Sequence, residues 1–198
     1  MITNQSVTFF DTQFQKQVAN NDFALNPFET VVLPFVRGRA LDLGCGMGNL
    51  SIEAARRGAN VVAVDASSAA IERIQKTASA EKLAIEAVLA DIGNYEITGR
   101  FDTVIAIGLL MFFQREKALA LLADIQEHVA GQGLAIINVL TEGTTFMGMF
   151  EPGNYYLFGP SELEDRFKGW NILHSVHDGF DAPGNTRKEF STVVAQKK

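Results

Sequence analysis

The chain has 198 residues, of which 47% are hydrophobic and 20% are charged, a balance typical of one globular domain with a sizeable core. Its formal net charge of −6 argues against nucleic acid or an anionic membrane surface as a partner, because phosphate binding needs a cationic face and the chain contains no run of Lys or Arg. The single cysteine, Cys45, excludes an internal disulfide and fits a reducing compartment.

No membrane or export segment is predicted. The longest apolar run, residues 104–113, is far too short to span a bilayer. Residues 1–6 contain neither the basic region nor the long apolar region of a secretory signal. We therefore expect a cytoplasmic protein with no membrane partner, either a monomer or a homodimer.

The chain then divides into a helical start and an alternating α/β region. Residues 1–36 lack the alternation of a strand and predict one or two helices, a cap segment laid over the sheet edge. Beyond them, short apolar runs alternate with helical periods, which indicates a largely parallel sheet. The predicted strands are 39–44, 60–64, 85–89, 102–107, 133–139, 170–177 and 188–195. The last two are predicted to be antiparallel neighbours, because a parallel pair needs a longer crossover.

Apolar spacing predicts the helices between these strands. The first ends at Gly58, and the second begins after an N-cap at Ser67 or Ser68. The third spans Ala118 to Val129 and stops at Gly131. A short helix is predicted at 160–168, after a loop of small, Met and aromatic residues at 141–159.

The segment 40–49, Ala-Leu-Asp-Leu-Gly-Cys-Gly-Met-Gly-Asn, is the most informative motif. An apolar strand leads into three alternating glycines and then into a helix. Glycine lets the backbone turn sharply and approach a ligand closely, and a helix N-terminus favours an anionic group. The spacing G-x-G-x-G follows an acid, Asp42, and Asn49 stands where the third glycine of the dinucleotide fingerprint would fall. The alternative is an ordinary tight strand-to-helix turn.

Two further acids follow predicted strands. Asp65 ends the second strand about 20 residues past the glycines, where a carboxylate can accept hydrogen bonds from both ribose hydroxyls. Asp91 follows the third strand. The alternatives are an acid at the start of a helix for Asp65 and an acid in a surface turn for Asp91.

The glycine segment resembles motif I of the class I S-adenosylmethionine (SAM) methyltransferases. The chain is most similar to the tellurite-resistance branch, on the patterns at 109–113, 158–163, 169–170 and 181–185. The resemblance covers residues 23–198. It implies a Rossmann-like α/β fold with a seven-stranded sheet, five parallel strands plus an antiparallel hairpin, flanked by helices on both faces. The whole chain, 1–198, would form a single domain.

The resemblance also implies SAM as the cofactor, S-adenosyl-L-homocysteine as its product, and a role for each matching residue. The implied contacts with the methionine part are Asp42 at the ammonium and the turn residues Leu43, Gly44, Cys45 and Gly46. The implied contacts with ribose and adenine are Asp65, Ala66, Ser67, Asp91 and Ile92. Those near the sulfonium are Ile107, Gly108 and Met111.

The chemistry of the acceptor is less constrained. The sequence offers no compelling general base and no assigned catalytic residue, which favours a soft sulfur, selenium or tellurium nucleophile over an oxygen or carbon that must be deprotonated. No metal site is predicted, because His174 and His177 lie three residues apart on a strand and point to opposite faces.

The substrate side is predicted to combine the 141–159 loop with the N-terminal segment. The predicted substrate contacts are Phe146, Tyr155, Tyr156 and Arg187, with packing on the domain as the alternative for the aromatic ones. Acids near Arg187 argue against an oxyanion substrate. The leading function is methyl transfer to a small molecule; the alternatives are an NAD(P)-dependent oxidoreductase and a SAM-binding module without catalysis.

Overall fold

A computed structural model describes residues 5–198. Its centre is a seven-stranded sheet in the order β3-β2-β1-β4-β5-β7-β6. The strands are β1 Arg39–Leu43, β2 Asn60–Asp65, β3 Ile85–Leu89, β4 Phe101–Ile107, β5 Val129–Leu140, β6 Asn171–Ala182 and β7 Thr186–Gln196. The first five are mutually parallel, and β7 runs antiparallel to both β5 and β6. The predicted sheet with its closing antiparallel hairpin is therefore confirmed.

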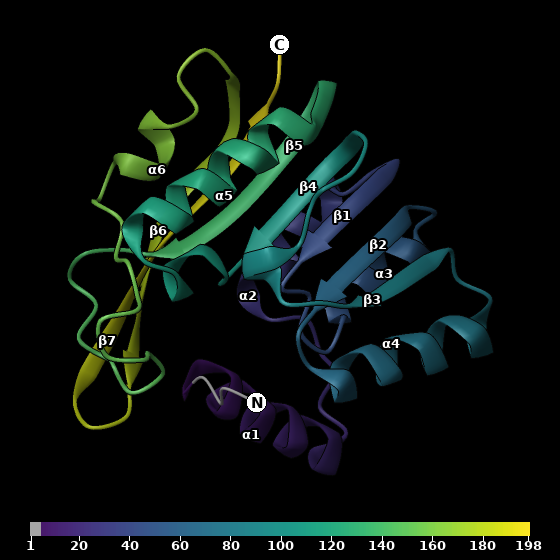
Figure 1. Cartoon of the computed structure of the whole chain (residues 1–198), viewed down its shortest axis with the longest axis horizontal. Helices are drawn as coiled ribbons and strands as arrows, with labels where there is room; N and C mark the ends of the chain where they lie inside the picture. The colour runs from purple at the N-terminus through teal and green to yellow at the C-terminus, as the bar shows by residue number, and fades with distance from the viewer. Residues whose placement is uncertain (1–4) are drawn as a thin grey trace.

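Helices cover both faces of this sheet (Figure 1). They are α1 Gln5–Asn20, α2 Pro27–Val32, α3 Asn49–Arg56, α4 Ser68–Glu81, α5 Arg115–His128 and α6 Glu162–Asp165. Short 3-10 turns occur at η1 Leu33–Phe35, η2 Ile92–Asn94 and η3 Leu110–Phe112. The helices α5 and α6 pack on one face, whereas α2, α3 and α4 pack on the other.

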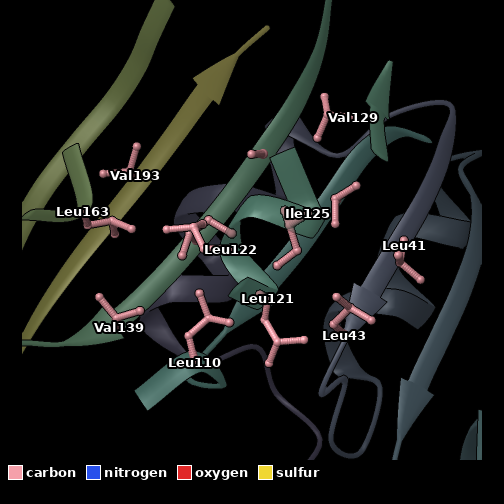
Figure 2. Close-up of a cluster of buried hydrophobic side chains, with 14 of the residues drawn as sticks. Leu41, Leu43, Leu110, Leu121, Leu122, Ile125, Val129, Val139, Leu163 and Val193 are labelled. Atoms are coloured by element: carbon pink, nitrogen blue, oxygen red, sulfur yellow. The ribbon is translucent and has the colours of Figure 1, made fainter. Parts of the chain in front are cut away.

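The helical periodicity of α5 explains its packing. Leu121, Leu122 and Ile125 are buried against Leu41 and Leu43 of the central strand β1 and against neighbouring strands (Figure 2). Residues spaced by three and four positions share one face of a helix, so this stripe meets the sheet along its length. The burial of these side chains holds α5 against the strands of the sheet.

The end of α5 differs from the prediction. The helix ends at His128 rather than at Gly131, because Val129 already pairs with Phe101 of β4. The ammonium of Lys197 satisfies the carbonyls at the helix end: its Nζ lies 2.7 Å from the oxygen of Gln126 and 3.0 Å from that of Val129. A glycine cap is therefore not needed there.

The predicted N-terminal helices are present within residues 5–36. The start of α2 is set by Asn26, whose side chain accepts from the backbone of Glu29 while the Glu29 carboxylate accepts from the backbone of Asn26. The helix α1 lies across the carboxyl ends of the parallel strands rather than beside an outer strand (Figure 1). Within residues 5–198, every helix is too short or too polar to cross a bilayer.

Candidate functional site

The glycine turn between β1 and α3 needs glycine for both conformation and space. Gly44, Gly46 and Gly48 have φ of +67°, +52° and +74°, in the left-handed region. A Cβ on Gly48 would lie 2.4 Å from Cγ1 of Ile74 on α4. A Cβ on Gly44 would lie 3.0 Å from Cδ1 of Leu109. The turn therefore leaves room for a ligand to approach the backbone closely.

Asp65, at the end of β2, holds this turn in place. Its Oδ2 accepts from the backbone N–H of Gly46 at 2.8 Å, and its Oδ1 accepts from the backbone N–H of Ser67 at 2.9 Å. These two bonds fix the carboxylate between the glycine turn and the start of α4. A carboxylate has about four acceptor positions and can hold several donors at once.

Asp91 occupies the corresponding position after β3. Its Oδ1 accepts from the backbone N–H of Gly93 at 2.9 Å, and its Oδ2 accepts from the amide of Asn94 at 2.7 Å. The carboxylate thus caps η2 and is held at the carboxyl end of the sheet. The neighbouring Ile92 is buried, which gives this part of the site an apolar wall.

Asp42 is the most buried acid of the site, with 4% of its surface exposed. Its pKa is raised to about 7, mainly by burial. The charges of Glu29 and Asp65 also raise the pKa, whereas the hydroxyl of Ser51, which donates to Oδ2 at 2.6 Å, lowers it. Near neutral pH this carboxyl is therefore poised between its two protonation states. A cation placed beside it would favour the charged form.

Cys45 lies inside the glycine turn and is also buried. Burial raises the pKa of its thiol well above the ordinary value, and the negative charges of Asp42 and Asp65 act in the same direction. The thiolate is the nucleophilic form of cysteine. Cys45 therefore contributes its backbone to the turn rather than a reactive sulfur, as the sequence indicates.

These residues line one cavity of about 430 Å³ at the carboxyl ends of the parallel strands. The predicted cofactor residues that line it are Asp42, Gly44, Cys45, Gly46, Asp65, Ala66, Ser67, Asp91, Ile92, Ile107, Gly108 and Met111. Leu43 does not line it, because its side chain points into the core below α5. We call residues 42–46, 65–67 and 91–92 the glycine side of the cavity.

The opposite wall is formed by α1, α2, β5, the 141–159 loop and β7, and we call it the aromatic side. The sequence reasoning named the N-terminal segment and the 141–159 loop for the substrate side, but not β5 or the residues that line this wall. Its members include Phe9, Phe10, Phe28, Asn138, Leu140, Met149, Lys188 and Phe190. One available signal was the lone Asn138 within an apolar strand. The phenylalanines carried no signal, because an amphipathic helix shows which residues are apolar but not what they face.

The predicted substrate contacts lie outside the lining of this cavity. The ring of Phe146 lies beneath the ammonium of Lys188, with 4.6 Å between Nζ and the ring centroid. Tyr155 stacks on Phe150 at 5.0 Å between centroids and is 38% exposed. The hydroxyl of Tyr156 donates to Glu162, 2.5 Å away.

Arg187, the fourth predicted substrate contact, also lies outside the cavity lining. Its exposed guanidinium pairs with Glu189 and with Asp181, and these carboxylates raise the pKa of Arg187. Its positive charge is therefore already matched by two acids. Among residues 5–198 no cluster of three metal-ligating side chains occurs, and His174 and His177 project from alternate faces of β6, as predicted.

Comparison with known proteins places this arrangement in a family. The sequence model described as "Tellurite resistance protein TehB" matches residues 7–186. The chain belongs to the TehB family. A TehB of Haemophilus influenzae strain 10810, named a probable S-adenosyl-L-methionine-dependent methyltransferase, is 27% identical over 168 residues, which are 81% of this chain and 57% of that protein. The chain thus spans little more than half of this TehB relative.

Solved structures agree on the TehB-like fold. The crystal structure of TehB from Haemophilus influenzae superposes with a TM-score of 0.77 at 23% identity, covering 92% of this chain and 65% of that one. The 1,6-didemethyltoxoflavin-N1-methyltransferase of Burkholderia thailandensis, solved with 1,6-didemethyltoxoflavin and S-adenosylhomocysteine, gives 0.70 at 18% identity over 98% and 87% of the two chains. At these identities the likeness shows the fold, which is that of Rossmann-like methyltransferases.

Proposed function

We propose that this TehB-family chain transfers a methyl group from SAM to a small-molecule acceptor with a soft nucleophile. One observation carries the proposal: a single cavity brings the glycine turn, Asp65 and Asp91 together at the carboxyl ends of three neighbouring parallel strands. Ligands of open α/β sheets bind at that end. The names of the relatives and the fold of the structural neighbours support the same reaction class.

The glycine side has the chemistry needed to hold SAM. A carboxylate ligand group fits the first turn of α3, whose leading backbone N–H groups have no partner within the helix. The glycines before α3 leave room for the group to approach the backbone closely. A Cβ on Gly46 would lie 3.4 Å from the ring of Phe14, so a larger residue would narrow this cradle. The buried carboxyl of Asp42 fits an ammonium, which is the partner that would hold it charged.

The remaining contacts follow from the strand ends. Asp65 would accept from the two ribose hydroxyls, as a carboxylate at a strand end can, with Ala66 and Ser67 beside the base. Asp91 and the backbone of Ile92 would read the adenine edge. Ile107, Gly108 and Met111 also line the cavity and would lie near the sulfonium of SAM.

The composition of the cavity lining supports a soft acceptor. Among the described residues, its lining contains neither His nor Tyr. Its four carboxylates already accept hydrogen bonds: Asp42 from Ser51, Asp65 from the glycine turn, Asp91 from η2 and Glu29 from the start of α2.

Bound SAM would supply a methyl group on a sulfonium, and the acceptor's lone pair forms the new bond to carbon as the carbon–sulfur bond breaks and its electron pair stays on sulfur. A sulfur, selenium or tellurium anion needs no proton removed for this step. The protein's part is to align the two ligands and exclude water.

Calorimetric titration with S-adenosylhomocysteine tests the cofactor assignment. We expect binding to the intact protein, at least tenfold weaker binding to Asp65→Ala, and unchanged binding to Asp165→Ala, which removes an exposed acid of α6. Parallel titration with NAD⁺ separates the oxidoreductase alternative. Preference for NAD⁺, or no binding of S-adenosylhomocysteine, would contradict the proposal.

A further inference from the structure

The aromatic side of the cavity contains a buried amide whose oxygen has no hydrogen-bond partner among the described residues. Asn138 on β5 is fully buried, and its Nδ2 donates to the hydroxyl of Thr192 on β7 at 2.8 Å. Within residues 5–198 its Oδ1 has no hydrogen-bond partner, although Asn138 lines the cavity. A buried carbonyl oxygen left without a partner is costly, which points to a ligand that donates to it.

A cation lies on the same side of the cavity. Lys188 on β7 is half-buried and is the single Lys or Arg among the described residues of the lining. Burial lowers the pKa of its ammonium, and no ion pair satisfies that charge within residues 5–198. Its Nζ lies over the face of the Phe146 ring. An anionic group on a ligand would therefore gain a partly desolvated partner there.

Flat apolar side chains form the rest of this wall. Phe28 of α2 and Phe190 of β7 pack with 4.6 Å between ring centroids. Phe9 of α1 lines the space, as do the buried residues Leu140 and Met149. Aromatic faces bind planar rings by offset or edge-on stacking, which gives more than their buried area alone.

We propose that the methyl acceptor is a small planar aromatic anion that also carries a hydrogen-bond donor. Its ring packs against Phe28 and Phe190, its anionic group faces Lys188, and its donor reaches Asn138 Oδ1. This inference rests on the proposed function, because it places the acceptor beside the methyl group of SAM. The proposed function names the nucleophilic atom, and this inference names the kind of molecule that carries that atom.

An inorganic oxyanion fits this wall poorly. Such an ion is strongly hydrated and must replace its water with several charged or N–H donors. The aromatic side offers one ammonium, and the unpartnered atom of its buried amide is an acceptor oxygen, which cannot donate to an oxyanion. The nearby Arg187, which could have added charge, is paired with Glu189 and Asp181 outside the lining.

The test uses the protein saturated with S-adenosylhomocysteine, so that binding is measured without turnover. The probe is meta-hydroxybenzoate, which has the ring, the charge and the donor. Three matched probes each remove one feature. Meta-hydroxybenzamide lacks the charge, benzoate lacks the donor, and 3-hydroxycyclohexanecarboxylate lacks the planar ring. Selenite and tellurite represent the inorganic oxyanions.

The proposal expects meta-hydroxybenzoate to bind more tightly than each matched probe and than selenite or tellurite. Lys188→Met should weaken its binding about tenfold or more while leaving meta-hydroxybenzamide unaffected, since only the acid uses the ammonium. Asn138→Leu should weaken meta-hydroxybenzoate but not benzoate. The matched control is Lys168→Met, which removes an 82% exposed lysine and should change nothing.

The outcomes separate the two levels of the account. If S-adenosylhomocysteine binds but the acid and the amide bind equally, or if selenite or tellurite binds more tightly, the aromatic-anion inference is overturned and the methyltransferase proposal stands. Equal affinity of Lys188→Met and the intact protein for meta-hydroxybenzoate would also overturn it. If S-adenosylhomocysteine does not bind at all, the proposed function falls together with the inference.

Discussion

The two sides of the cavity are built in different ways. The glycine side comes from three strand ends and one tight turn, and its polar contacts are mostly backbone N–H groups held by carboxylates. The aromatic side joins segments from the start, the middle and the end of the described chain, and its contacts are side chains. The glycine side can hold a common nucleoside through its backbone, whereas substitution of a few side chains on the aromatic side can change which ligand binds there.

The two sides also differ in how far the family resemblance describes them. The glycine side contains the motif that the chain shares with class I methyltransferases. The aromatic side contains Asn138, which donates to Thr192 of β7, and Lys188, which lies over the ring of Phe146. Substitutions on the two sides should therefore have separable effects on stability, cofactor binding and acceptor binding.

The largest effect is expected in the glycine turn. Gly48→Ala places a methyl group 2.4 Å from Ile74 at a φ of +74°, so overpacking and backbone strain should together lower the free energy of unfolding by about 3 kcal/mol. Gly153→Ala has a φ of +76° with no atom within 4 Å, and should cost about 1 kcal/mol. Denaturant unfolding of both variants measures the difference, and equal losses would show that space in the turn is unimportant.

A smaller effect is expected from the buried acid. Because the pKa of Asp42 is raised to about 7 in the folded protein, the neutral form is favoured by folding, and stability present at pH 4 should be lost as the pH rises through 7. Asp42→Asn should remove most of this pH-dependent loss while weakening S-adenosylhomocysteine binding.

Unfolding of the intact protein and of Asp42→Asn from pH 4 to 8, without ligand, measures this difference. Asp165→Asn serves as the exposed-acid control. Parallel pH profiles for Asp42→Asn and the intact protein would mean that Asp42 is ionised throughout and would remove the argument for its role at an ammonium.

The next prediction concerns the loop next to the aromatic side. Tyr156→Phe removes the hydrogen bond to Glu162 and should lower the free energy of unfolding by roughly 1 kcal/mol. Because Tyr156 lies outside the cavity lining, binding of meta-hydroxybenzoate should not change. Weaker binding with unchanged stability would instead make Tyr156 a substrate contact and would extend the aromatic side beyond Met149 along the 141–159 loop.

The smallest effect is expected at Arg187. Its exposed guanidinium makes surface ion pairs that contribute little, so Arg187→Met should leave the unfolding midpoint unchanged within error. Binding of meta-hydroxybenzoate should also be retained, in contrast to Lys188→Met. A loss of binding in Arg187→Met comparable to that in Lys188→Met would show that both cations reach the ligand.

Local signals in the sequence were enough for the sheet and for most of the glycine side. Each strand is a short apolar run, and the glycines and acids stand directly after those runs, so chain order gives their place at one end of the sheet. The prediction failed at Gly131, where pairing of Val129 with Phe101 ends α5 earlier than the glycine. The side chain of Leu43 packs in the core, so the predicted contact of its backbone with the methionine part stays a prediction.

The aromatic side could not be predicted from local pattern. Aromatic residues occur both in α1 and in the 141–159 loop, and only the tertiary packing puts Phe9 and Phe10 in the cavity and leaves Phe146 and Tyr155 outside it. Asn138 was visible as a polar residue in an apolar strand, but its free oxygen depends on Thr192 of β7. Such contacts join segments more than fifty residues apart, beyond the reach of periodicity.

The most direct test is a crystal structure of the complex with S-adenosylhomocysteine. The account predicts the amino-acid tail on the turn of Gly44 and Gly46, the ribose hydroxyls on Asp65, the adenine beside Asp91, and the sulfur facing the aromatic side. A ligand bound elsewhere, or bound in this cavity with its ribose away from Asp65, would contradict the account.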